Sequence, residues 1–348
     1  MIDLKNPEEI KKLDPKDVYG STEMLPDQCR QIWEDTKTVN IPESYRSINN
    51  IIVCGMGGSA YGGHIVQTLF KDKLGLPLYV NSDYHLPGFA DQNSLVFLTS
   101  YSGSTEEVLS CANEAFEKGC KILGLTSGGK VSEILNERKL PCLTFNSSFN
   151  PSGQPRLGTG YIIIGSLGIL NKIGLLKIND DEVENAISEL SSNKEAIKAK
   201  AILLAGNIQN KIPVIMASEF LEGNAHIMRN QFNETSKSFS AFSFLPELNH
   251  HLMEGLKNPQ DKKMAIIYLS SSLYSPILKK RGELTKDVVG KNNIEFIEYN
   301  VVGKDKLSQM LNVLSLGGYL TLYLALLYGL DPSLIPWVDY FKEKLSSK

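Results

Sequence analysis

Several features are scarce or missing in this chain of 348 residues, and each absence excludes a class of protein. The net charge is only −3 and no block of lysines and arginines occurs, so we do not expect nucleic acid or an anionic membrane as the main partner. The longest apolar stretches are interrupted by Gly, Asn or Lys and fall short of a membrane span. No apolar core of a signal peptide follows the first residues.

Cysteine is also scarce. The five cysteines are Cys29, Cys54, Cys111, Cys120 and Cys142. Their number is odd and their spacings match no zinc-binding pattern, which is typical of free thiols in a reducing compartment. The sequence therefore predicts a cytoplasmic protein without structural metal or disulfide.

The composition is that of a globular protein, with 42% hydrophobic and 22% charged residues, and the length suggests two domains. Strand and helix signals alternate, stop at a polar Lys- and Glu-rich segment, and then restart. This pattern predicts a duplicated, doubly wound α/β fold with parallel sheets. We expect lead-in helices over residues 1–45, a first domain over 46–178, a linking helix over 179–200, and a second domain with a C-terminal helix over 201–348.

Short β-branched or apolar runs mark nine strands. They are Ile51–Cys54, Leu78–Asn81, Leu95–Ser100, Lys121–Thr126, Cys142–Phe145, Val214–Ser218, Ser240–Phe244, Met264–Ser270 and Ile294–Val301. The main helices are expected at Asp27–Thr36, Ile65–Leu69, Glu106–Lys118, Tyr161–Leu176, Asn179–Lys200, Leu307–Leu327 and Ile335–Leu345.

Two loops of the first domain combine glycine with hydroxyl side chains. Gly57-Gly58-Ser59 follows the first strand, and Ser100 to Thr105 follows the third with four aliphatic hydroxyls, one Gly and no Lys. A strand, such a turn and a helix N-terminus together can hold an anion through backbone N–H groups and hydroxyls. Two such loops in one parallel sheet predict one phosphate group held from two sides without a metal.

Simpler interpretations of these loops remain open. Ser59 fits the N-cap of a helix, and Ser104 with Glu107 fits a capping box. The first loop also fits a dinucleotide fingerprint if Ala60 replaces the last glycine, with Asp83 as the acidic residue. It is not a Walker loop, because no Gly-Lys-Ser/Thr follows. A third Gly/Ser turn at Ser127-Gly128-Gly129 is expected to be an ordinary turn on the same rim.

Polar residues elsewhere are candidates for chemistry. The two prolines of Pro151–Arg156 can hold Arg156 in place, although a lone arginine more often forms a surface salt bridge. Glu234 lies near the end of a helix-like segment, where a buried carboxylate would have the raised pKa that a general base needs; a single Glu is more often on a solvated face. Adjacent His250 and His251 carry no metal-ligand pattern.

Together these residues resemble the bifunctional phosphoglucose/phosphomannose isomerases, which are built from sugar-isomerase (SIS) domains. The resemblance runs from about residue 30 to the C-terminus. The motifs that carry it are Gly57-Gly58-Ser59, Ser100-x-Ser102-x-x-Thr105, Pro151–Arg156, Asn233-Glu234-x-x-Lys237 and Asn249-His250. The Ser/Thr loop is generic to SIS domains, whereas the Glu-to-His spacing together with the Pro-x-x-x-x-Arg loop is more specific.

The resemblance implies two SIS-type αβα sandwich domains and an aldose–ketose isomerase of hexose 6-phosphates that needs no metal or other cofactor. It implies that Glu234 moves a proton between C2 and C1, that Arg156 stabilises the cis-enediolate, and that His250, contributed across a homodimer, opens the sugar ring. Lys342 would assist at the ring, with Lys344 and Lys348 as rivals. The residues implied to hold the phosphate are Ser59, Ser100, Ser102, Thr105 and the Gly58 backbone.

Three other functions compete with this one. A non-catalytic sugar-phosphate sensor would bind the same ligands, but the chain lacks an N-terminal helix-turn-helix and a basic face. The isomerase half of a glucosamine 6-phosphate-forming amidotransferase would need an N-terminal nucleophilic Cys, and position 2 is Ile. A Rossmann dehydrogenase is disfavoured by the imperfect fingerprint.

Overall fold

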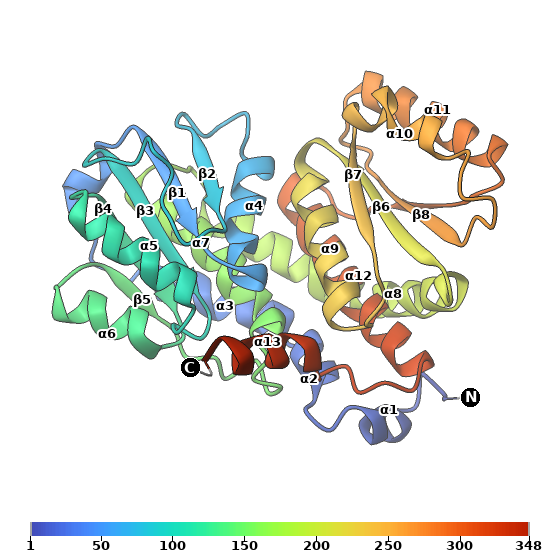
Figure 1. Cartoon of the computed structure of the whole chain (residues 1–348), viewed down its shortest axis with the longest axis horizontal. Coiled ribbons are helices and arrows are strands. Elements are labelled where there is room, and N and C mark those ends of the chain that lie inside the picture. Colours follow the sequence, from blue (N-terminus) through green and yellow to red (C-terminus); the bar gives the residue numbers. More distant parts are fainter. Residues whose placement is uncertain (1, 347–348) are drawn as a thin grey trace.

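Two parallel β-sheets form the framework of the computed structural model, which describes residues 2–346 (Figure 1). The first sheet has the order β2-β1-β3-β4-β5 and the second has the order β7-β6-β8-β9. The strands are β1 Asn50–Cys54, β2 Leu78–Asn81, β3 Ser94–Ser100, β4 Lys121–Thr126, β5 Cys142–Thr144, β6 Ile212–Ser218, β7 Ala241–Leu245, β8 Met264–Ser270 and β9 Glu295–Asn300. The nine predicted strands are therefore confirmed, each within two residues at either end.

Helices surround both sheets, as the doubly wound prediction requires (Figure 1). They are α1 Pro7–Leu13, α2 Val18–Glu23, α3 Leu25–Thr36, α4 Tyr61–Leu69, α5 Glu106–Glu117, α6 Gly129–Glu137, α7 Thr159–Ile173, α8 Asp180–Ile208, α9 Glu222–Glu234, α10 Leu252–Gly255, α11 Pro276–Lys291, α12 Lys306–Leu327 and α13 Pro336–Ser346. Because helices cover both faces, central strands such as β3 are buried at every position, and β3 carries the unbroken apolar run Leu95–Leu98.

The expected linking helix is longer than predicted. It starts with a capping box between Asn179 and Glu182, as its polar beginning suggests, but α8 continues past residue 200 to Ile208. Its last two turns carry buried side chains, among them Leu204 and Ile208, and the helix packs along α12. The helix is therefore part of the core of the second half and not only a connection.

One helix, α12, is long and apolar enough to cross a membrane by length and composition, within the part of the chain that the structure describes. Of its most apolar window, 89% is buried inside the fold. A core helix of a folded domain has the same composition, because it is surrounded by apolar neighbours on all sides.

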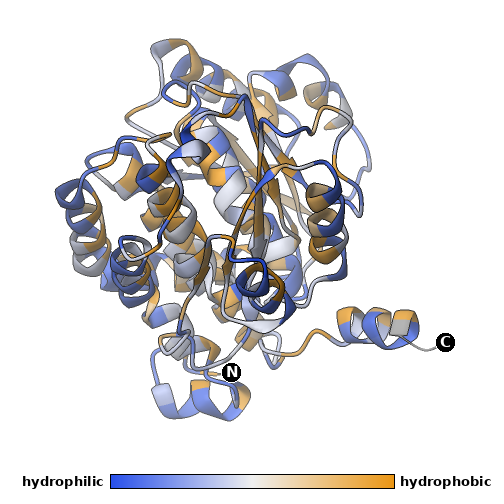
Figure 2. Ribbon diagram, turned by 90° about the vertical axis from the view of Figure 1, so that its left-hand side faces the viewer, coloured by the Kyte–Doolittle hydropathy of each residue, from blue (hydrophilic) through white to orange (hydrophobic). Residues whose placement is uncertain are grey.

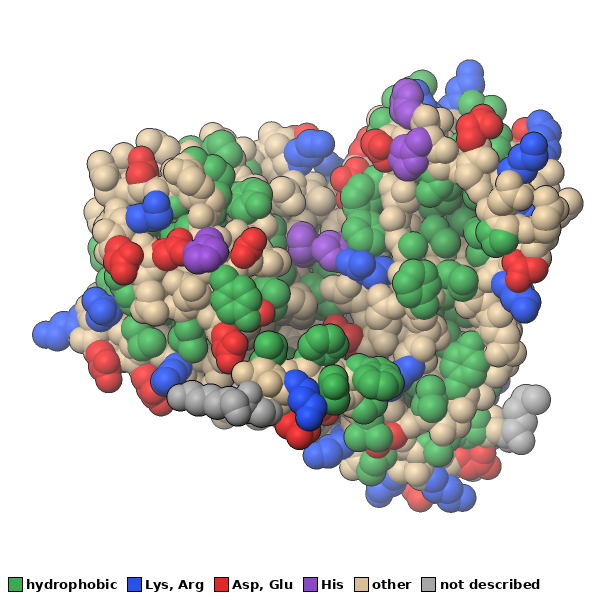
Figure 3. Space-filling model, in the orientation of Figure 1, with side chains coloured by type: hydrophobic (Ala, Val, Ile, Leu, Met, Phe, Trp, Pro, Cys, Tyr) green, Lys and Arg blue, Asp and Glu red, His purple; other side chains and the backbone are tan. Residues whose placement is uncertain are grey.

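The two halves meet where α4 of the first contacts α9 of the second, and the surface is hollowed between them (Figure 3). The C-terminal helix α13 stands away from the body of the molecule (Figure 2). Its apolar side chains are largely in solvent, with Trp337 77% and Phe341 65% exposed.

Candidate active site

The first loop is built to approach its neighbours closely. It leaves β1 through a 3₁₀ turn, Gly57–Ala60, and enters α4. A Cβ atom on Gly58 would lie 3.2 Å from the Cα of Arg156, which is tighter than an ordinary van der Waals contact, so glycine favours this close approach of the two backbones. The Ser59 hydroxyl oxygen accepts the backbone N–H of Tyr101 at 2.9 Å. Ser59 therefore joins the two loops, and its predicted role as the N-cap of α4 is wrong, because Ala60 occupies that position without a side-chain cap.

The second loop keeps its hydroxyls together at the start of α5. Ser100 Oγ and Thr105 Oγ1 lie 2.8 Å apart, and the Ser100 oxygen also accepts the Gly103 N–H at 3.1 Å. Ser102 is exposed. The predicted capping box is absent: the N-cap is Thr105, and its side chain makes no capping hydrogen bond. The positive end of the α5 dipole is thus open to an anion.

The third Gly/Ser turn packs against the second loop and is hydrogen-bonded to it. Ser127 Oγ donates to the Tyr101 carbonyl at 2.7 Å, and Val131 N–H donates to the Gly103 carbonyl at 2.9 Å. A Cβ on Gly103 would lie 1.8 Å from the Gly128 oxygen, so the two turns touch at a backbone-to-backbone contact. This turn fixes the shape of the Ser100 to Thr105 loop, in agreement with its interpretation as an ordinary turn.

Arg156 lies in a 3₁₀ turn, Pro155–Leu157, and is 4% exposed. Its Nη2 donates to the carbonyls of Pro332 and Ser333 at 2.9 and 2.8 Å, and its Nη1 donates to Gln154 Oε1 at 2.9 Å. Its Nε is buried without a partner among the described residues. The alternative of a surface salt bridge is therefore wrong, and a fixed cation with one donor still unused lies beside the first loop.

Glu234 is the last residue of α9, from the opposite half of the molecule. Burial raises the pKa of its carboxyl group, although the charges of Arg156, Lys237 and Lys342 act in the opposite direction. The packing of α9 against α4 brings this carboxylate to the side of the loop that carries Arg156. A carboxylate with a raised pKa next to a fixed guanidinium is suited to abstracting a proton from carbon.

Lys237 belongs to the same cluster, although the sequence indicated it only as part of a motif. Its Nζ donates to the carbonyls of Thr235, Asp331 and Pro332 at 3.0, 2.9 and 3.0 Å. Burial and then the charge of Arg156 lower its pKa to about 8. Because Pro332 also accepts from Arg156, the two cations hold one short segment that leads to α13.

The C-terminal helix carries the predicted lysine. The charge of Lys342 acts on the pKa of Glu234, whereas Lys344 lies over the ring of Tyr340, 5.7 Å from its centroid. This difference is consistent with the prediction that Lys342, and not Lys344, belongs to the site. Lys348 lies outside the described residues.

His250 is not brought to Glu234 within one chain. It ends a 3₁₀ turn, Glu247–His250, after β7, and its side chain is exposed. It is not among the groups that act on the pKa of Glu234. The neighbouring His251 forms a contact of 2.8 Å with Glu247.

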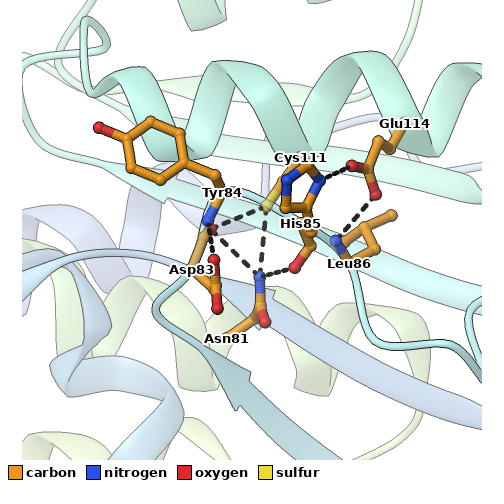
Figure 4. Close-up of polar contacts among 7 residues, drawn as sticks. All are labelled: Asn81, Asp83, Tyr84, His85, Leu86, Cys111 and Glu114. Atoms are coloured by element: carbon orange, nitrogen blue, oxygen red, sulfur yellow. Dashed lines mark hydrogen bonds and ion pairs between the residues drawn. The ribbon is translucent and has the colours of Figure 1, made fainter.

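The segment after β2 is held against α5 by hydrogen bonds (Figure 4). Asn81 Nδ2 donates to the Cys111 sulfur at 3.2 Å, and the Cys111 thiol donates to the Asp83 carbonyl at 3.3 Å. His85 and Glu114 form a contact of 2.5 Å further along the same helix. The side chain of Asp83, the acidic residue of the dinucleotide alternative, is exposed, and its segment holds α5 and therefore the second loop in position.

Comparisons with known proteins identify the family of the chain. Residues 197–345 match the family model described as bacterial phospho-glucose isomerase C-terminal SIS domain. A bifunctional phosphoglucose/phosphomannose isomerase from Caldicellulosiruptor bescii is 33% identical over 94% of this chain and 99% of its own length. One from Thermoplasma acidophilum is 30% identical over 93% of this chain and its whole length.

Solved structures share the fold at lower identity. A hypothetical protein from Thermus thermophilus superimposes with a TM-score of 0.74 at 15% identity, over 97% of this chain and 92% of the other. This likeness supports the two-sheet SIS architecture. The sequence relatives extend over nearly the full length of both partners, and on that ground the chain belongs to the bifunctional phosphoglucose/phosphomannose isomerase family.

Proposed function

We propose that this protein is an aldose–ketose isomerase that interconverts glucose 6-phosphate and fructose 6-phosphate, and also mannose 6-phosphate. The observation that carries the proposal is that Glu234, whose pKa is raised by burial, lies within the electrostatic reach of the buried guanidinium of Arg156 from the other half. The relatives named for both activities span almost the whole chain, which supports both epimers as substrates.

The phosphate group would occupy the two loops of the first half. Thr105 and the uncapped N-terminus of α5 offer donors, and Ser59, Ser100 and Ser102 lie in the same two connected loops. Hydroxyls and backbone N–H groups can bind a phosphate monoester without a metal or a lysine, because the helix dipole supplies part of the positive potential. We assign the Gly58 backbone to the same site.

The reacting carbons would lie between Glu234 and Arg156. The carboxylate takes the C2 proton of the open-chain aldose, the electrons move toward the C1 carbonyl oxygen, and a cis-enediolate forms. Arg156 stabilises the negative oxygen through a donor that has no other partner among the described residues. When the proton on O2 passes to O1, return of the carbon-bound proton to C1 gives the ketose, whereas its return to either face of C2 gives the glucose or mannose epimer.

We assign ring opening to His250 from a second copy of the chain, together with Lys342. Within one chain His250 is exposed and is not among the groups that act on the pKa of Glu234. A surface groove of about 500 Å³ beside it is lined by Met253, Ile277 and Leu284, and these last two side chains are 62% and 56% exposed. Such an apolar surface next to His250 supports a homodimer in which each copy completes the site of the other.

A coupled assay in EDTA tests the activity. The purified protein is given fructose 6-phosphate, and glucose 6-phosphate and mannose 6-phosphate are followed separately. Formation of both supports the bifunctional isomerase, and formation of glucose 6-phosphate alone restricts the proposal to one epimer. Binding of the sugar phosphate without turnover would instead support a sensor.

Complementation tests the shared site. Glu234→Gln and His250→Ala proteins, each of low activity, are mixed and allowed to exchange subunits. If the site is shared, half of the dimers are mixed and each has one intact site, so about a quarter of the wild-type activity returns. If each chain uses its own histidine, no activity returns, and the assignment of His250 to the second copy is wrong.

A further inference from the structure

Tyr61 is the first residue of α4, two positions after Ser59 of the first loop. Its side chain is fully buried, with 0% exposed surface. Its hydroxyl group nevertheless has no hydrogen-bond partner among the described residues, and it is the only tyrosine in residues 2–346 whose buried hydroxyl lacks one. The side chain of Asn230 lies near enough to lower the pKa of the phenol but does not meet the geometry of a hydrogen bond.

Other buried tyrosines of the chain illustrate the usual arrangement. Tyr45 donates to the Ile122 carbonyl at 2.8 Å, and Tyr274 donates to the Leu269 carbonyl at 3.0 Å. A buried hydroxyl without a partner is costly, and a phenylalanine of the same shape would avoid that cost. Stability of the folded chain therefore gives no reason for the oxygen atom of Tyr61.

The surroundings of this hydroxyl are those of the proposed active site. After burial, the charge of Glu234 has the largest effect on the pKa of Tyr61, and the charges of Arg156 and Arg229 act on it as well. Burial and Glu234 together raise this pKa, so the phenol stays protonated and is a donor.

Further unused donors lie around the same hydroxyl. The Nε atoms of Arg156 and Arg229, whose charges act on the pKa of Tyr61, are also buried without partners among the described residues. Three unpaired donors in one neighbourhood suit a ligand rich in oxygen atoms. An open-chain sugar carries an oxygen on each carbon and has this chemistry.

We propose that Tyr61 is a substrate-contacting residue that donates a hydrogen bond to a hydroxyl group at C3 or C4 of the bound hexose 6-phosphate. The assignment rests on the proposed isomerase function. Tyr61 follows the loop assigned to the phosphate on C6, and the charge of the base assigned to C1 and C2 acts on its hydroxyl, so we place this hydroxyl beside the middle of the sugar chain. It would orient the reacting carbons while the phosphate is held elsewhere.

Tyr61→Phe is the test, with Tyr45→Phe as the matched control. Removal of the unpaired Tyr61 hydroxyl should leave the melting temperature unchanged or raise it, and should lower kcat/KM for fructose 6-phosphate by about tenfold. Tyr45→Phe, which loses a bond to a buried carbonyl, should lower the melting temperature by about 2 °C and leave kcat/KM unchanged. If Tyr61→Phe keeps the wild-type kcat/KM, the proposal is overturned whatever its stability.

A binding measurement separates this inference from the isomerase function on which it rests. Glucitol 6-phosphate has the hydroxyl chain without a carbonyl, and inorganic phosphate occupies the loops alone. Tyr61→Phe should weaken the binding of glucitol 6-phosphate about tenfold and leave the binding of inorganic phosphate unchanged. This result can be obtained even if the wild-type protein has no turnover. Equal affinities of wild type and variant for glucitol 6-phosphate would overturn the contact.

Discussion

The two sheets place the same kind of loop at corresponding positions, and the two loops differ in how their donors are satisfied within the chain. In each sheet the second strand in the spatial order, β1 or β6, is followed by a 3₁₀ turn and a helix. Both turns begin with a residue in the left-handed region, Gly57 with φ 50° and Glu219 with φ 48°. The neighbouring strands β3 and β8 each lead into a serine-containing loop and a helix, which makes the two regions directly comparable.

In the second half the donors are satisfied from within the chain. Glu219 Oε1 accepts the backbone N–H of Ser275, the N-cap of α11, at 3.2 Å. Ser271 Oγ donates to Gln309 Oε1 at 2.6 Å, and Lys279 donates to the carbonyl of the loop residue Ser272. A carboxylate from the chain itself thus holds the helix start that an external anion would otherwise occupy.

The comparison indicates what would separate a binding loop from a structural one. Gly57 has no side chain that could act as an internal acceptor, and α5, which follows the second loop, begins without a side-chain capping bond. Glu219 stands at the corresponding place in the second half and supplies an acceptor there. The number of hydroxyls in a loop is a weaker indicator of binding than the presence of internal acceptors for them.

The largest expected effect separates binding by the first half from chemistry by the second. Glu234→Gln should lower kcat by about 10³-fold, because the amide cannot accept the proton, while affinity for inorganic phosphate is retained. Glu219→Gln is the matched control on the preceding structural turn and should keep the wild-type kcat. Steady-state kinetics and phosphate titration measure both. Near-normal turnover of Glu234→Gln would show that another group is the base.

The next largest effects are expected from two serines at corresponding places, Ser102 in the loop after β3 and Ser271 in the loop after β8. Ser102 is exposed in the open loop, so Ser102→Ala should raise KM for fructose 6-phosphate about tenfold at unchanged stability. Ser271 is buried, and Ser271→Ala leaves Gln309 Oε1 without its donor, so it should lower the free energy of unfolding by about 1–2 kcal/mol at unchanged KM. Denaturant unfolding measures the free energy of unfolding, and steady-state kinetics measure KM. A higher KM in Ser271→Ala would contradict the division of roles.

Strands and loops were predictable from the sequence because their signals are local. Apolar runs marked every strand of both sheets, and the Ser100 to Thr105 loop was recognisable by composition. The hydrogen bond that takes Ser59 away from its predicted capping role comes from Tyr101, 42 residues further along the chain. The predicted end of α8 at residue 200 is too early, because the last turns of the helix bury apolar side chains along α12.

The site was predictable in its residue types and less so in its partners. The motif around Glu234 indicated a base, and the structure adds the cause of its raised pKa, which is burial between the two halves. Nothing local marked Tyr61 as a member of the same cluster, and Lys237 was indicated only as part of the motif around Glu234. Their positions depend on the contact between α4 and α9 and on the segment before α13, which join residues far apart in the sequence.

The pH dependence of the reaction tests which lysine faces the base. Because burial raises the pKa of Glu234, kcat/KM should begin to fall, as the pH is lowered, at a pH above the ordinary value of 4.5 for a glutamate. Lys342 favours the charged carboxylate, so Lys342→Met should move this acid limb to still higher pH. Lys344→Met on the same helix should leave it in place. A shift in the second variant alone would make Lys344 the lysine of the site.

The smallest effect concerns the seam between the halves, where α4 contacts α9. The ring centroids of His64 on α4 and His226 on α9 lie 4.2 Å apart, and the His226 ring stacks on Phe242 at 4.8 Å. Arg229 lies over the same Phe242 ring. Burial lowers the pKa of His64 to about 4 and of His226 to about 3, and the charge of Arg229 contributes to both shifts.

Between pH 6.5 and about 4 the unfolded chain therefore binds protons that the folded His64 and His226 do not, so stability should fall as the pH decreases through this window. The double variant His64→Gln/His226→Gln should show a flatter decline of melting temperature from pH 6.5 to 4. His85 is the control of opposite sign. Its hydrogen bond to Glu114 raises its pKa, so its contribution is complete below pH 6.5 and is lost as the pH rises. In His85→Gln the melting temperature should decline between pH 6.5 and 4 as steeply as in the wild type. An equally steep decline in the double variant would show that the seam between the halves does not carry this pH dependence.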